Sequence, residues 1–81
     1  MKFIWPESAR AELRLIDREA AIRILHALAK YGESGSGDVK ALAGQWQTYF
    51  RIRVGDYRVI FTIGPEEITI VRACHRSDAY R

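Results

Sequence analysis

Residues 49–61, with the sequence YFRIRVGDYRVIF, constrain the fold more than any other stretch of the chain. Apolar and polar side chains alternate on both sides of Gly55-Asp56, and a period of two is typical of half-buried strands. A two-residue connection that begins with Gly predicts a hairpin with a type II′ turn. The register follows from this turn: Arg53 lies opposite Arg58, and Arg51 lies opposite Ile60.

The predicted hairpin has one apolar and one basic face. The apolar face, which we expect helices to cover, comprises Phe50, Ile52, Val54, Val59 and Phe61. The other, which we call the arginine face, gathers Arg51, Arg53 and Arg58 without an acidic cross-strand partner. Like charges directly opposite each other destabilise a sheet, and bidentate pairing with phosphate would relieve the repulsion. The arrangement therefore predicts a polyanion site, the alternative being a solvated face of arginine stems.

The chain before the hairpin has a helical pattern. Lys2–Trp5 is predicted to form a short strand that ends at Pro6, a residue favoured in the first turn of a helix. Apolar residues then recur every three to four positions, and Asp17 is well placed to cap a second helix. We expect two antiparallel helices, the second ending near Gly32, followed by a flexible Gly/Ser loop over residues 32–37.

A further turn at residues 64–67 leads into a predicted strand, Ile68–Cys74. The whole chain, residues 1–81, is therefore expected to be one small α+β domain. It would contain an N-terminal strand, a two-helix hairpin and a three-stranded antiparallel meander, with both helices on one sheet face. If the turn closes without a bulge, Arg58 faces Ala73 and His75 points towards the arginine face, whereas a bulge reverses that direction.

Charge is divided unevenly along the chain. The net charge is +3. Residues 1–38 carry six basic and six acidic side chains, whereas residues 39–81 carry seven basic and four acidic ones. Six of those seven bases are arginine, whose planar fork suits phosphate. A charge that served solubility alone would be spread more evenly, so the asymmetry favours a localised anionic partner.

Several classes of protein are excluded by composition. The single cysteine, Cys74, excludes an intramolecular disulfide framework and suits a reducing cytoplasm. No apolar run approaches the roughly 20 residues that span a bilayer. The N-terminus, MKFIWPESAR, lacks the pattern of a signal peptide. We therefore expect a cytoplasmic domain with no membrane partner.

Three segments together carry a family resemblance: GDVKALAG (37–44), YFRIRVGDYRVIF (49–61) and HRSDAYR (75–81). They resemble the RelE/ParE superfamily of bacterial and archaeal toxins, and more closely its RelE branch. The resemblance implies a RelE-like fold and the toxin of a type II toxin–antitoxin pair. It implies an acidic, RelB-like antitoxin, through which the complex would bind operator DNA. It also implies a metal-independent endoribonuclease without a cofactor, which cleaves messenger RNA in the ribosomal A site and so inhibits translation.

The resemblance also implies the site residues. The catalytic set would be Arg51, Arg53, Arg58, His75, Arg76 and Tyr80. Apart from the resemblance, we expect Lys40, Tyr49 and Arg81 to bind RNA. The reaction would be attack of a ribose 2′-OH on the adjacent phosphate, giving a 2′,3′-cyclic phosphate and a free 5′-OH.

One departure from the family pattern affects this chemistry. Well-known RelE enzymes carry lysine where this chain has Arg51 and Arg53, and arginine effectively cannot lose its proton. The general base would then be His75 or Tyr80, unless orientation and electrostatics alone activate the 2′-OH. A second departure is that the chain shown ends at Arg81, without the C-terminal helix of some relatives.

Two other functions fit the same fold. One is a ParE-like toxin that inhibits DNA gyrase without cleaving RNA. The other is a module that binds RNA, the ribosome and an antitoxin but has weak or no catalytic activity. The presence of Arg58, Arg76 and Tyr80 beside two basic residues on one strand favours the ribonuclease.

Overall fold

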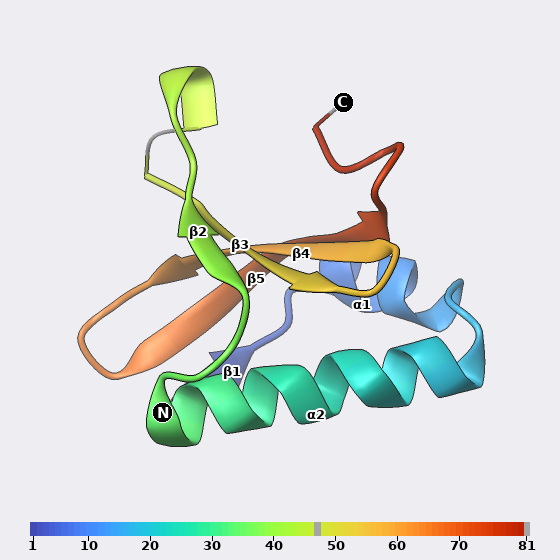
Figure 1. Ribbon diagram of the computed structural model, residues 1–81, viewed down its shortest axis with the longest axis horizontal. Helices are drawn as coiled ribbons and strands as arrows, with labels where there is room; N and C mark the ends of the chain where they lie inside the picture. Colours follow the sequence, from blue (N-terminus) through green and yellow to red (C-terminus); the bar gives the residue numbers. More distant parts are fainter. Residues whose placement is uncertain (47, 81) are drawn as a thin grey trace.

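The structure, a computed structural model, describes residues 1–46 and 48–80 of the chain. Its elements are β1 (Lys2–Ile4), α1 (Glu7–Arg14), α2 (Arg18–Ser34), β2 (Val39–Ala41), the 3₁₀ turn η1 (Gly44–Trp46), β3 (Phe50–Val54), β4 (Tyr57–Ile63) and β5 (Glu67–His75). The strands form one sheet in the order β1-β5-β4-β3-β2. Figure 1 shows both helices on one side of this sheet and the C-terminal segment on the other. The predicted α+β fold, with its helices on one sheet face, is confirmed.

The central hairpin has the predicted register. Arg53 is the cross-strand partner of Arg58, and Arg51 is that of Ile60. Gly55 has a φ of 60°, whereas no non-glycine residue in the described chain has a positive φ. A positive φ at the first turn position alone is the signature of a type II′ turn, so both the turn and the register are confirmed.

The two predicted helices are present, but the second is longer than expected. The side chain of Asp17 accepts a hydrogen bond from the Ala20 N–H at 3.1 Å, which confirms the N-cap. The helix α2 continues through Gly32 to Ser34 and is capped by Gly35, which has a left-handed φ of 73°. The prediction of an end near Gly32 is therefore wrong. Gly32 has a different role: a Cβ there would lie 2.9 Å from Phe3 Cζ, so the glycine lets α2 approach β1.

The sheet contains one strand that the sequence pattern did not reveal. The three residues of β2 pair antiparallel with β3, and Lys40 lies opposite Arg51. Three residues are too few to show a period of two, and no apolar run marks this segment. The antiparallel meander thus has four strands, and with β1, which pairs parallel with β5, the sheet has five.

The hydrophobic core lies between the helices and the predicted apolar face. It contains Ala9, Ile24, Leu28, Ile52, Val59, Phe61, Ile68, Ile70 and Ala73. The ring of Phe61 lies in this core. The centroid of the Phe61 ring is 5.7 Å from that of the Tyr31 ring and 5.9 Å from that of the Phe50 ring. Phe50 and Val54 pack against this cluster. The expectation that helices cover this face of the hairpin is therefore confirmed. Among the described residues, no helix has the length and apolar character needed to cross a bilayer.

A bulge interrupts the pairing of β4 with β5. Phe61 pairs with Ile70, but Ile60 pairs with Arg72, so Val71 is an extra residue. The physical reason is the sequence of β5. After Ile70, strict alternation would turn Arg72 into the core, where an unpaired guanidinium is very costly. The bulge turns Ala73 inward instead, and Ala73 is fully buried.

The bulge also corrects the expectation for His75. Arg58 pairs with Cys74 rather than Ala73, and Tyr57 pairs with His75. Side chains directly opposite each other in an antiparallel pair lie on the same face. His75 therefore lies on the same face as Tyr57, which packs against the helix-side core. The expectation that His75 points towards the arginine face is wrong.

Candidate functional site

The strand register arranges basic side chains in rows across the arginine face. One row runs through Lys40 on β2, Arg51 on β3, Ile60 on β4 and Arg72 on β5. The next row runs through Arg53, Arg58 and Cys74. Residues directly opposite each other share a face. Four adjacent strands thus bring five basic residues, Lys40, Arg51, Arg53, Arg58 and Arg72, to one face of the sheet.

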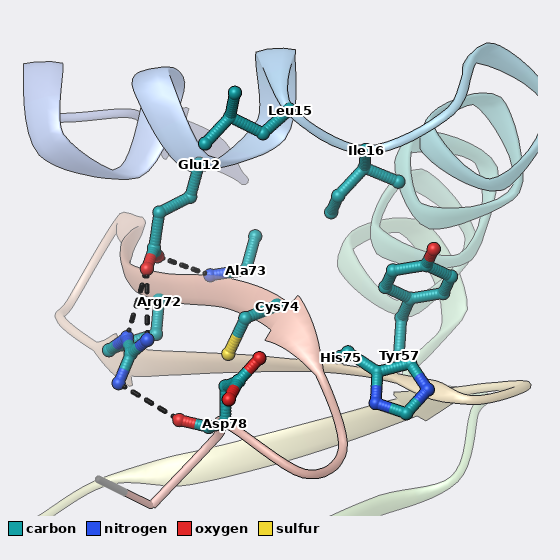
Figure 2. A pocket seen from close by; sticks show the side chains of 9 residues that line it. All are labelled: Glu12, Leu15, Ile16, Tyr57, Arg72, Ala73, Cys74, His75 and Asp78. Atoms are coloured by element: carbon teal, nitrogen blue, oxygen red, sulfur yellow. Dashed lines mark hydrogen bonds and ion pairs between the residues drawn. The ribbon is translucent and has the colours of Figure 1, made fainter.

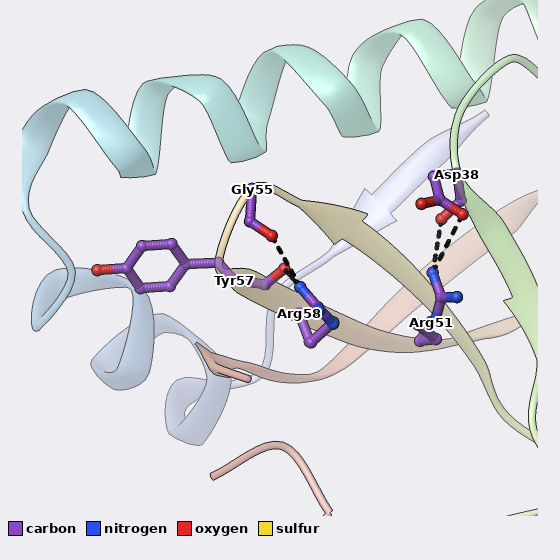
Figure 3. A network of polar contacts seen from close by, with 5 residues as sticks. All are labelled: Asp38, Arg51, Gly55, Tyr57 and Arg58. Carbon is purple, nitrogen blue, oxygen red and sulfur yellow. Dashed lines mark hydrogen bonds and ion pairs between the residues drawn. The ribbon is translucent and has the colours of Figure 1, made fainter. Parts of the chain in front are cut away.

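Arg51 is the most constrained of the three hairpin arginines. Its Nη1 donates to the backbone oxygen of Asp38 at 3.0 Å and lies 3.3 Å from Asp38 Oδ1, as Figure 3 shows. Its side chain is only 16% exposed. Sequence reasoning did not connect Asp38 with this face, and only recognition of β2, which starts at the next residue, could have found it. Arg51 therefore has an acidic neighbour that partly neutralises it.

Arg53 and Arg58 form the more available pair. Arg58 Nη1 donates to the backbone oxygens of Gly55 at 2.9 Å and Tyr57 at 3.0 Å (Figure 3). This bends the side chain back onto the hairpin turn and leaves Nε and Nη2 without a hydrogen bond to the described residues. The exposed Arg53 side chain forms neither a hydrogen bond nor an ion pair within residues 1–46 and 48–80. Both side chains therefore have donors that a ligand could engage.

Arg76 lies at the same end of the sheet as this pair. Its backbone N–H donates to the backbone oxygen of Asp56 at 2.8 Å, which extends the pairing of β4 with β5 by one residue. Its Nε is 4.0 Å from Asp56 Oδ1, and the side chain is 64% exposed. An ion pair that long and that exposed is weak. The guanidinium of Arg76 can therefore exchange Asp56 for an anionic ligand.

The chain after β5 makes a turn over residues 76–80, on the side of the sheet away from the helices (Figure 1). Ala79 in this turn and Ile60 on the arginine face are both fully buried, and neither belongs to the helix-side core. The burial of Ile60 shows that other residues cover this part of the arginine face. Tyr80 follows Ala79 and is 46% exposed. The turn thus brings the predicted Tyr80 to the side that carries the arginines.

His75 is the predicted catalytic residue that lies apart. Its ring meets the Tyr57 ring edge-on at a centroid distance of 5.8 Å, and its Nδ1 is 3.0 Å from Ser77 Oγ. It lines a pocket of about 460 Å³ whose apolar wall includes Leu15 and Ile16 (Figure 2). The structure therefore groups Arg51, Arg53, Arg58 and Arg76 but separates His75 from them.

The predicted RNA-binding residues have different outcomes. Lys40 lies beside Arg51 on the arginine face. Tyr49 is half-buried, and its backbone oxygen accepts a hydrogen bond from the Leu42 N–H at 2.9 Å, beyond the end of β2. Arg81 lies outside the described residues. Within those residues, no three His, Cys, Asp or Glu side chains gather as metal ligands would.

Comparison with known proteins identifies the family of the chain. A family model described as the ParE toxin of type II toxin–antitoxin systems matches residues 3–80, which is nearly the whole chain. The chain belongs to the ParE toxin family. The recognition of a RelE/ParE superfamily toxin from three sequence segments is confirmed. A search of curated proteins found no match to the chain.

Solved structures show the same fold in related toxins. The RelB–RelE complex of Methanococcus jannaschii is 23% identical, with a TM-score of 0.75 over 95% of this chain and 94% of that one. RelBE2 of Mycobacterium tuberculosis is 22% identical, with a TM-score of 0.80 over 93% and 96%. A mutant of YafQ from E. coli is 10% identical, with a TM-score of 0.80 over 99% and 98%. At these identities the likeness establishes the fold of this ParE-family toxin.

One charged cluster of the toxin was missed by sequence reasoning. Glu12 of α1 accepts hydrogen bonds from Arg72 and from the Ala73 N–H on β5. The hydrogen bond to Glu12 is the main reason why the pKa of Arg72 is raised above its ordinary value, against the opposing effect of burial. No sequence signal links these residues, because 60 positions separate Glu12 from Arg72.

Cys74, which follows this cluster on β5, is an unreactive thiol. Burial is the largest cause of the raised pKa of Cys74, and it outweighs the opposing effect of Arg72. A thiol with a raised pKa is protonated at neutral pH and is a poor nucleophile. Cys74 therefore belongs to the packing of β5 rather than to a reactive site.

Proposed function

We propose that this toxin is a ribosome-dependent, metal-independent endoribonuclease that cleaves messenger RNA in the A site and thereby stops translation. The observation that carries the proposal is the pairing of Arg53 with Arg58 directly across the hairpin, with Arg76 at the same end of the sheet. Two guanidinium groups held opposite each other favour a ligand with high negative charge density. The structural likeness to RelE and YafQ toxins supports this reading.

The proposed reaction is an in-line attack of a ribose 2′-oxygen on the adjacent phosphorus. A new bond forms between the 2′-oxygen and phosphorus, and the bond from phosphorus to the 5′-oxygen breaks. The products are a 2′,3′-cyclic phosphate and a free 5′-hydroxyl. Negative charge develops on the phosphorane oxygens, and preorganised donors such as Arg53, Arg58 and Arg76 stabilise that charge in the transition state.

Proton transfer must come from a different residue type, because arginine keeps its proton. The 2′-OH loses one proton, and the leaving 5′-oxygen gains one. We assign this work to Tyr80, whose hydroxyl can donate and accept and which belongs to the C-terminal turn, a segment on the side of the sheet away from the helices. His75 is a weaker candidate because its ring lies against Tyr57 on the other face. Arg51, which is bonded to Asp38, contributes charge and holds the start of β2.

The proposed partners follow from the same face. Lys40, Tyr49 and Arg81 would extend the RNA contact away from the scissile phosphate. An acidic, RelB-like antitoxin would neutralise the toxin, and the complex would reach operator DNA through that antitoxin. Relatives solved as RelB–RelE complexes support such a partner. A substrate held in the ribosome places the toxin's activity in the cytoplasm.

The proposal is tested by inducing the toxin in cells and mapping messenger RNA ends by primer extension. Arg58→Ala and Arg76→Ala should each reduce cleavage by about 100-fold or more, as loss of one transition-state donor does elsewhere. Arg23→Ala is the matched control, because Arg23 is an exposed arginine on α2, in the layer away from the arginine face. It should leave cleavage unchanged.

Other outcomes would replace the proposal. DNA breaks without cuts in translated RNA would point to the gyrase-inhibiting function described for ParE-like toxins. Ribosome and antitoxin binding without either kind of damage would indicate a binding module. Full cleavage by both arginine variants would overturn the site assignment.

A further inference from the structure

The C-terminal turn, residues 76–80, supplies two of the proposed site residues, yet it lies beyond the last strand. A hydrogen bond from the Asp78 N–H to the His75 backbone oxygen at 2.9 Å closes the turn. A short turn outside the strand pairing of the sheet opens readily unless further contacts hold it. The question is therefore which contacts hold Arg76 and Tyr80 over the arginine face.

Glu12 begins the connection, from the other side of the sheet. Its Oε2 accepts from both Arg72 Nε at 3.1 Å and Arg72 Nη2 at 3.0 Å. Its Oε1 accepts from the Ala73 N–H at 2.9 Å. Figure 2 shows the carboxylate reaching from α1 to the edge of β5, where both partners meet it.

The position of these bonds along β5 explains why a carboxylate is needed there. The neighbouring strand β1 pairs with β5 only as far as Thr69, so it offers no acceptor to the Ala73 N–H. The Glu12 carboxylate takes the place of the missing strand. Both side chains of the ion pair are mostly shielded from solvent, with 28% of Glu12 and 24% of Arg72 exposed. Charge-assisted pairs that are shielded in this way are stronger than exposed ones.

Arg72 carries the connection on to the C-terminal turn. While two of its nitrogens bind Glu12, Nη1 donates to the backbone oxygen of Asp78 at 3.2 Å (Figure 2). One rigid guanidinium thus links α1 to the turn. An ammonium group on a flexible stem could pair with Glu12 but could not hold both partners in the same plane.

We propose that Glu12 is a positioning residue for the active site. It fixes the guanidinium of Arg72, and Arg72 in turn holds the C-terminal turn so that Arg76 and Tyr80 stay on the arginine face. The effect on cleavage rests on the proposed function, whereas the mechanical link between Glu12 and the turn does not. The two parts therefore need separate measurements.

Hydrogen–deuterium exchange of the full-length toxin tests the link itself. Glu12→Gln and Glu12→Ala should raise the exchange rate of the amides at 77–80 by about tenfold or more, with little change in the β3–β4 hairpin. Glu7→Gln is the matched control, because Glu7 lies on the same helix and pairs with Arg10 and Arg14 in solvent. Unchanged exchange at 77–80 in both Glu12 variants would overturn the link.

Cleavage kinetics on programmed ribosomes test the positioning role. Glu12→Ala should lower kcat by about tenfold or more with little change in KM, because misplaced groups mainly affect the transition state. Glu12→Gln, which keeps an acceptor for the Ala73 N–H, should recover part of the loss. Arg72→Lys should lower kcat as well, even where its thermal midpoint matches that of the wild type.

The two measurements separate the two ideas. Faster exchange with unchanged kcat would overturn the positioning role and leave the proposed function intact. A wild-type protein that cleaves no RNA would refute the proposed function, and the exchange result would still decide the link. If Glu12→Ala loses kcat because the whole protein unfolds, Glu12→Gln decides the question. That variant must show faster amide exchange at 77–80 while the protein stays folded.

Discussion

The two faces of the central hairpin differ in what their side chains do. The face towards the helices buries Ile52, Val59 and Phe61 and holds no buried polar side chain among the described residues. The face away from them carries Arg53 and Arg58 opposite each other, a pairing that weakens a sheet. One face therefore supplies stability, and the other gives up some stability to concentrate charge. We therefore expect substitutions on the helix-covered face to lower mainly the stability of this toxin, and substitutions on the arginine face to lower mainly its activity.

The largest expected change in stability comes from a substitution on the helix-covered face. Phe61→Ala should lower the free energy of unfolding by about 3–5 kcal/mol, because a buried ring leaves a cavity that the neighbours cannot fill. Phe61 is fully buried and contacts Tyr31 and Phe50. Urea unfolding followed by far-UV circular dichroism measures the change. A loss below about 1 kcal/mol would show that this face is not the main source of stability.

A smaller effect is expected where α2 approaches β1. Gly32→Ala should destabilise the protein by about 1–3 kcal/mol through overpacking against Phe3, although alanine is the better helix former. Gly35→Ala is the contrasting variant. It meets no atom within 4 Å but must adopt a φ of 73°, so it is destabilised by backbone strain instead. Thermal unfolding that shows Gly32→Ala to be stabilising would contradict the prediction and show that the Phe3 ring moves aside at little cost.

The sharpest test of the comparison is on the arginine face. Arg53→Gln should raise the free energy of unfolding by roughly 0.2–1 kcal/mol at low salt, since it removes a like-charge pair. The gain should shrink as salt screens the charges. The same variant should lose cleavage activity. Arg51→Gln serves as the matched control, because it removes an ion pair with Asp38 and should not stabilise the protein.

The smallest expected effect concerns pH. Burial raises the pKa of Cys74 in the folded protein. The thiol therefore contributes stability that is present below its ordinary pKa and is lost as the pH rises through the raised value. Compared with Cys74→Ala, the wild-type protein should lose slightly more stability on moving to alkaline pH. Parallel unfolding curves for the two proteins across this range would contradict the prediction.

The sequence predicted the hairpin best, because a two-residue turn that starts with Gly55 leaves one register open. It also located the cap at Asp17, since few residue types satisfy the free N–H groups of a helix. The predicted helix end at Gly32 failed because this glycine is required by a tertiary contact with Phe3, which the local sequence pattern does not contain. The sequence pattern failed at β2 because three residues are too short to show a period.

The candidate site was predicted in part for the same reason. Residues on the hairpin, Arg53 and Arg58, were placed correctly because their register is local. The position of His75 depended on the bulge at Val71. The available signal was Arg72, which strict alternation along β5 would have turned into the core. The link from Glu12 to Arg72 joins α1 to β5, and only the folded chain brings such distant residues together.

The most direct measurement of the central claim is the chemistry of the RNA ends. Purified toxin would be added to ribosomes stalled on a defined message with an empty A site, and the new 3′ ends would be captured by a ligation specific for 2′,3′-cyclic phosphate. The wild type and Arg23→Ala should give one major cut in the A-site codon, and Arg58→Ala should give at least about 100-fold less. Equal cutting by Arg58→Ala, or no cyclic phosphate ends from the wild type, would contradict the proposed function.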